Sequence, residues 1–168
     1  MPSDATAYGH PQEEAPPLSD APLSDELALA VVRARRRATR DADRQIDTAH
    51  LLHSLLESDP GVRAAFDDTG QVARLLGYLV QRSIGYGLQW QGAVEDSGTV
   101  PVPGGALVWS PQAAAAMEAG AGRAALRGEE RARGADVLAA LAADGECRAV
   151  EVLGRAGVDV ARLRRALG

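Results

Sequence analysis

The sequence contains no lysine, so all 18 of its basic residues are arginines. A nucleotide-binding loop of the Gly-x-x-x-x-Gly-Lys-[Ser/Thr] type needs that lysine, and its absence excludes an ATPase of this class. The single cysteine, Cys147, cannot form an internal disulfide, which fits a reducing compartment. No apolar run reaches the roughly 18 residues of a membrane-spanning helix, and the N-terminal residues lack the pattern of a secretory signal. We therefore expect a cytoplasmic protein that does not enter membranes.

Aromatic residues are scarce at 4% of the chain, whereas hydrophobic residues make up 46% and alanine alone about a fifth. This composition favours helices that pack closely through small side chains. The net charge is −5, and most of it comes from the proline-rich segment 1–22, which holds four acidic residues and no arginine. We expect that segment to be disordered, because it has too few apolar residues to offset its ordering entropy. The rest of the chain is nearly neutral, which argues against nucleic acid as a partner.

Capping residues and apolar periodicity predict four helices in each half of the remaining chain. The first begins after Ser24, the second begins near Asp47 or Thr48 and is stopped by Asp59-Pro60-Gly61, the third covers about 62–69 and ends at Gly70, and the fourth covers 71–84. Residues 85–108 are rich in glycine and proline and predict a linker, in which 88–94 and 99–102 could form a short strand pair. Helices are then expected over 111–126, 135–143, 147–156 and 159–167.

The two halves repeat one pattern. Leu23 and Trp109 are 86 residues apart, as are His50 and Asp136. A fixed period of this kind indicates two copies of one structural unit. The sequence therefore predicts an all-α fold of two tandem four-helix repeats, 23–84 and 109–168, related by a pseudo-two-fold axis.

Three features could carry chemistry. His50 and His53 lie three residues apart, a spacing that could serve a metal, but no third ligand is evident. We expect instead that His50 is a partly buried hydrogen-bonding residue and that His53 is on the surface. Cys147 at a helix start could be a nucleophile, although a small structural thiol is the simpler interpretation. The arginines of 33–44 are interrupted by acidic residues and lack aromatics, which is typical of a solvated helix face that could pair with an acidic partner.

These paired units resemble the Clp N-terminal domain, the double four-helix repeat at the front of ClpA- and ClpC-type AAA+ unfoldases. Each family repeat opens with an aromatic and a hydroxyl residue, continues with Gly-Thr-Glu-His-Leu-Leu at its second helix, and later has Leu-Gly-Val-Asp. The similar stretches here are Leu23-Ser24-Asp25-Glu26-Leu27, Trp109-Ser110-Pro111-Gln112-Ala113, Asp47-Thr48-Ala49-His50-Leu51-Leu52, Thr69-Gly70-Gln71-Val72, Ile84-Gly85-Tyr86-Gly87 and Ala156-Gly157-Val158-Asp159. The resemblance covers about 23–168 and is weaker in the second repeat.

The resemblance implies a non-enzymatic module of the Clp protease system that binds substrates, adaptors or cyclic peptide ligands, without cofactor or metal. A stand-alone copy could act as a decoy for antibiotics that target the unfoldase; the alternative is an accessory subunit on a Clp protease or unfoldase ring. The glutamates that bind phosphoarginine in the family are replaced by Ala49 and Ala135, so we expect little phosphoarginine binding.

The few aromatic residues cluster near the junction of the repeats, where they could fill the core or line an apolar groove. The ligand site is expected there, in a monomer, with the residues Leu23, Leu27, Tyr78, Tyr86 and Trp109.

Overall fold

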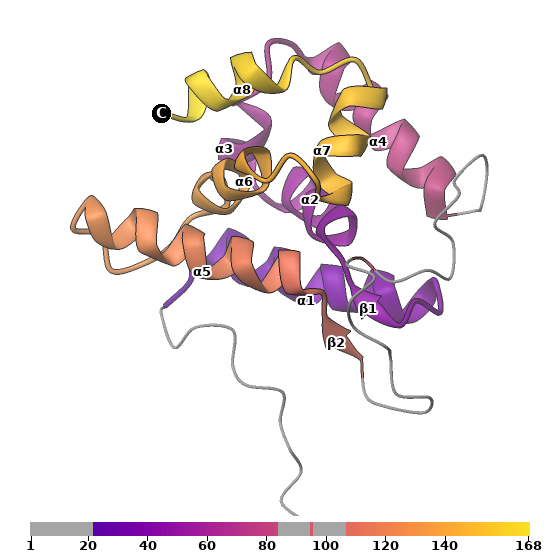
Figure 1. The fold of residues 1–168 in the computed structure, drawn as a ribbon, viewed down its shortest axis with the longest axis horizontal. Coiled ribbons are helices and arrows are strands. Elements are labelled where there is room, and N and C mark those ends of the chain that lie inside the picture. Colours follow the sequence, from indigo (N-terminus) through magenta and orange to yellow (C-terminus); the bar gives the residue numbers. More distant parts are fainter. Residues whose placement is uncertain (1–21, 84–94, 96–106) are drawn as a thin grey trace, which may run out of the picture.

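The computed structural model describes residues 22–83, Glu95 and residues 107–168, and everything below concerns those residues. They form eight helices and two strands of two residues each (Figure 1). The elements are α1 (Asp25–Arg40), β1 (Gln45–Ile46), α2 (Thr48–Ser58), α3 (Pro60–Arg63), α4 (Thr69–Ser83), β2 (Val108–Trp109), α5 (Pro111–Leu126), α6 (Gly134–Ala143), α7 (Arg148–Arg155) and α8 (Val160–Leu167). The expected all-α class is confirmed. The segment expected to be disordered and the strand pair expected in the linker both lie outside the described residues. None of the described helices is long and apolar enough to cross a membrane.

The helix starts follow local capping. Ser24 and Ser110 each accept a hydrogen bond from the backbone N–H three residues later, and Asp47 does the same for α2. The predicted bounds of the third helix, about 62–69, were wrong. Asp59 accepts from the Gly61 N–H and starts α3 at Pro60, which extends only to Arg63. Gly70 is not a C-terminal glycine but the second residue of α4.

Two crossed strand contacts join the halves. β1 and β2 pair in parallel with Ile46 opposite Trp109, and a second parallel bridge places Leu23 opposite Ala132. Ile46 and Ala132 are 86 residues apart, and so are Leu23 and Trp109. The two contacts are therefore related by the repeat. The Ser110 N–H donates to the Ile46 carbonyl at 2.9 Å, and the Ser24 N–H donates to the Ala132 carbonyl at 2.8 Å. The entrance of each repeat is therefore bound to the other repeat.

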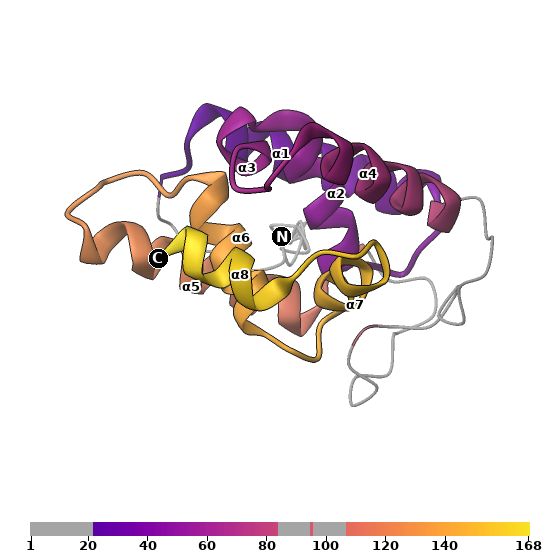
Figure 2. The same cartoon turned by 90° about the horizontal axis from the view of Figure 1, so that it is seen from above.

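α2 is the centre of the core. Nine of its eleven residues, Thr48 to Leu56, are buried, because α1, α4, α6 and α7 all pack against it. α6 has the matching place in the second half and packs on α5, α8 and α3. Figure 2 shows the first half above and the second half below, with α2 and α6 facing inward. Two glycines allow neighbouring helices to pack closely. A Cβ on Gly120 of α5 would lie 2.8 Å from Val137 of α6, and a Cβ on Gly134 of α6 would lie 2.9 Å from Val62 of α3.

Candidate functional site

A buried carboxylate from the linker lies where three helices begin. Glu95 is 4% exposed and accepts hydrogen bonds from the Thr48 N–H at 2.9 Å and from the Thr48 hydroxyl. It also accepts from the Arg148 N–H at 2.8 Å and from the Ser110 hydroxyl at 2.6 Å. Thr48 and Arg148 are the first residues of α2 and α7, and Ser110 caps α5. Helix starts present unpaired N–H groups and partial positive charge, so the carboxylate satisfies donors from both repeats.

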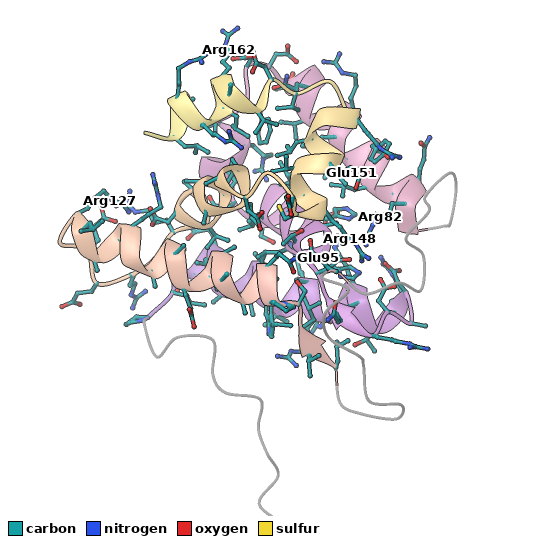
Figure 3. All side chains as sticks on the ribbon, viewed as in Figure 1. Arg82, Glu95, Arg127, Arg148, Glu151 and Arg162 are labelled. Carbon is teal, nitrogen blue, oxygen red and sulfur yellow. The ribbon has the colours of Figure 1, made fainter. Side chains whose placement is uncertain are left out.

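A second buried carboxylate lies beside the first. Asp47 is 1% exposed, and its Oδ2 accepts from Arg82 of α4 at 2.5 Å and from Arg148 of α7 at 2.9 Å. Burial disfavours its charged form, but His50 and Arg82 outweigh burial and hold the pKa of Asp47 far below its usual range. Figure 3 shows Arg82, Arg148 and Glu95 gathered at the start of α7, away from Arg127 and Arg162. This group of charges ties α2, α4, α7 and the linker together.

His50 forms hydrogen bonds, as the sequence predicted, but it is almost fully buried where partial burial was expected. Its Nε2 is 2.7 Å from Asp43 Oδ2, and its Nδ1 is 3.0 Å from the Asp47 backbone nitrogen and 3.1 Å from Asp47 Oδ1. Burial disfavours the imidazolium, yet the two carboxylates raise the pKa of His50 to about 9. Asp41, Asp43 and His50 are close enough to hold a metal ion together. Both ring nitrogens of His50 have protein partners: Nδ1 faces the Asp47 N–H, and Nε2 faces the Asp43 carboxylate.

The second repeat has an ion pair at the positions that correspond to Asp41 and His50, which lie 3.9 Å apart, and there the charges are reversed. The positions 86 residues after Asp41 and His50 are Arg127 and Asp136, and the Arg127 guanidinium holds the Asp136 carboxylate with bonds of 2.5 and 2.9 Å. Although burial opposes ionisation, Arg127 keeps the pKa of Asp136 below its usual value. The turn residue between is left-handed in both copies, with φ of 54° at Ala42 and 75° at Gly128. The repeat thus conserves a turn and a charge pair, not residue types.

The prediction for His53 was wrong. The side chain is only 4% exposed, because α1 covers it: Arg37 Nη1 lies 3.2 Å from His53 Nδ1. Burial and the charge of Arg37 lower the pKa of His53 to about 4, so it is neutral near pH 7. It does not share a site with His50, since the two rings contact different carboxylates. Cys147 is also buried, and burial raises its pKa to about 11, which is the opposite of an activated thiol.

The residues predicted to form one groove occupy separate places. Trp109 pairs with Ile46 beyond the C-terminal end of α1, whereas Leu23 precedes its N-terminal end; the 16 residues of α1 span about 24 Å. Tyr78 lies on α4, where its hydroxyl accepts from Arg155 at 3.3 Å. Leu27 is fully buried and offers a ligand no surface in this structure. Tyr86 lies outside the described residues.

Trp109 is the member of the set with the strongest binding potential. It is partly exposed and packs against both hydrophobic clusters of the core. Its neighbour Leu107 is partly exposed, and Val108 is 44% exposed. Leu107 and Val108 belong to the predicted linker and were not predicted as site residues, although their apolar character next to Trp109 is visible in the sequence. Glu95 was not predicted either, because no local pattern marks it. Of the two alanines at the family's phosphoarginine positions, Ala49 is fully buried and Ala135 is partly exposed.

No family model and no curated protein sequence matches this chain. Its structure is similar to that of the N-terminal domain of Hsp104 from Candida albicans, with a TM-score of 0.61 and 15% identity over 87% of this chain and 89% of that one. It is equally similar to the N-terminal domain of the caseinolytic protease associated chaperone ClpD from Arabidopsis thaliana, with a TM-score of 0.61 and 18% identity over 86% and 91%. The sequence resemblance is thus confirmed at the level of the fold: this chain has the fold of the Clp N-terminal domain.

Proposed function

We propose that this protein is a non-enzymatic module that binds peptides or protein segments for a Clp-type protease system. The proposal is supported by the fold, which the chain shares with the N-terminal domains of Hsp104 and of the caseinolytic protease associated chaperone ClpD. The buried, protonated thiol of Cys147 and the fully hydrogen-bonded ring of His50 favour binding over catalysis. We infer that the protein is a cytoplasmic monomer and that it captures substrates, adaptors or cyclic peptides.

The observation that carries the proposal is the apolar edge formed by β2, Val108 and Trp109, and by Leu107 directly before it. Among the described residues β2 pairs with β1 alone. A strand edge without a neighbour can pair with another chain through its backbone N–H and C=O groups. An extended peptide that adds to this edge gains main-chain hydrogen bonds, and its apolar side chains contact Val108 and the indole of Trp109. A partly exposed tryptophan held by a rigid core is the kind of residue on which binding energy concentrates.

Intrinsic fluorescence tests this site, because the chain has only two tryptophans. In a Trp90→Phe variant, Trp109 is the one remaining indole. Titration with an apolar peptide or with a cyclic peptide antibiotic should shift its emission to shorter wavelength and should saturate. No shift with either titrant at high micromolar concentration would contradict the proposal. A shift with the cyclic peptide alone would support the decoy version.

A matched pair of surface variants assigns the site. Val108→Asp should abolish the fluorescence response, whereas Val80→Asp on α4, where the side chain is 50% exposed, should not. Both positions are exposed, so both variants should keep their helix content. If peptides fail to bind but subunits of a Clp protease or unfoldase elute with the protein in fixed ratio, the chain is an accessory subunit and the peptide-binding proposal is wrong.

A further inference from the structure

The outer face of α1 is divided into an apolar half and a basic half. The face toward α2 consists of Leu27, Ala30, Ala34 and Ala38, all fully buried. The opposite face, at i, i+3, i+4, i+7 and i+11 spacing, presents Leu29, Val32, Arg33, Arg36 and Arg40. Leu29 and Val32 are 43% and 45% exposed, although both are large apolar residues. One exposed stripe of the helix therefore runs from apolar residues to arginines.

The basic half opens into a depression between α1 and α2. Its volume is about 620 Å³, and it is lined by Arg33, Arg36, Arg37, Arg40 and Glu57. Four arginines and one glutamate thus line the depression. A depression of this size can accept several side chains of a ligand.

Two of the arginines are fixed by α2. Arg37 forms an ion pair with Glu57 and contacts the ring of His53, and its side chain is 14% exposed. Arg33 donates to the Ser58 hydroxyl at 3.0 Å. The other two, Arg36 and Arg40, are exposed at the rim. A guanidinium group that is held in place loses little side-chain entropy when it pairs with a carboxylate.

The charge of the whole chain restricts the ligand. Outside segment 1–22 the chain is nearly neutral, so the basic depression is a local concentration of positive charge. A long polyanion would extend beyond the basic half onto surface of nearly balanced charge, whereas a short acidic segment fits within the basic half. The exposed Leu29 and Val32 add apolar contact at one end of the stripe.

We propose that the outer face of α1 is a second binding surface, distinct from the β2 edge, for a short peptide segment that combines clustered carboxylates with an adjacent large apolar residue. The carboxylates pair with the arginines of the depression. The apolar residue covers Leu29 and Val32, toward the N-terminal end of α1.

Fluorescence anisotropy tests the surface with the full chain and a labelled peptide of about a dozen residues, a length sufficient to follow α1, that carries four glutamates and one leucine. We expect saturable binding that weakens as salt is added, and no binding of the peptide with glutamine in place of glutamate. The double variant Arg36→Glu/Arg40→Glu should weaken binding at least about tenfold. The control Arg74→Glu/Arg165→Glu makes the same change of charge at exposed positions elsewhere and should leave affinity within about twofold.

Several results would overturn the proposal. Equal loss in the control variant would mean that only net charge matters. Tighter binding of single-stranded DNA than of the peptide would assign the depression to nucleic acid. A tenfold gain in affinity when Asp4, Glu13, Glu14 and Asp20 are made neutral would assign it to the chain's own acidic segment. The Val108→Asp variant, which tests the β2 edge, should bind the acidic peptide normally, so the two proposals can fail separately.

Discussion

Removal of the Glu95 carboxylate should strongly destabilise the protein. In Glu95→Ala, the N–H groups of Thr48 and Arg148 and the hydroxyls of Thr48 and Ser110 all lose their shared acceptor. The two N–H groups belong to the first residues of α2 and α7, so no carbonyl of their own helices can replace it. The side chain is 4% exposed, so these donors are left in a buried place that water reaches poorly.

The expected cost follows from the number and burial of these bonds. A buried donor left unsatisfied costs about 1–3 kcal/mol, and loss of one partner from a buried charged group costs about 3–5 kcal/mol. The two hydroxyls can rotate toward other acceptors, which leaves the two N–H groups as the main penalty. We therefore expect Glu95→Ala to lower the free energy of unfolding by about 3–5 kcal/mol. Glu95→Gln keeps one acceptor oxygen and should cost about half as much.

Urea unfolding followed by circular dichroism measures this difference, with Glu118→Ala as the control because Glu118 is exposed on α5. The control should lie within about 0.5 kcal/mol of the original protein. Amide hydrogen exchange locates the effect: the N–H groups of Thr48 and Arg148 should lose protection first in Glu95→Ala. A Glu95→Ala variant as stable as the control, with unchanged exchange at both amides, would refute the reasoning.

Two further predictions concern packing and pH. Gly134→Ala should destabilise the protein by about 1–3 kcal/mol, because the added methyl would collide with Asp59 and Val62 of the first repeat. In contrast, Gly77→Ala, with open space in α4, should stabilise it by about 0.5–1 kcal/mol in the same urea assay, and a loss at both positions would contradict the packing argument. Because the pKa of His53 is lowered to about 4, the folded state resists protonation there and loses stability as pH falls from the unfolded value of 6.5 toward 4. Between about pH 7 and about pH 5, the free energy of unfolding should fall by roughly 2 kcal/mol more in the original protein than in His53→Gln. Parallel pH profiles of the two proteins would show that the ring is not buried as described.

The sequence by itself determined the helices and the repeat. Ser24, Asp47 and Ser110 cap helices through bonds to residues three positions later, and such local bonds leave a local pattern. The bounds of α5 agree with the prediction at both ends. The 86-residue period indicated two copies, and the crossed contacts at Trp109 and Leu23 follow that period.

Only the tertiary structure decided which side chains meet. Strands of two residues have no detectable periodicity, so the pairing of Ile46 with Trp109 was invisible in the sequence. His53 has the spacing of a surface residue on an isolated helix, but α2 is covered on several sides and no face of it is left to solvent along most of its length. Glu95 is one acidic residue in a glycine-rich stretch, and its role depends on three helix starts that come together from distant parts of the chain. A helix-cap hydrogen bond joins residues that are close in the sequence, so the sequence shows it. A buried charge acquires its partners only when distant segments have packed together.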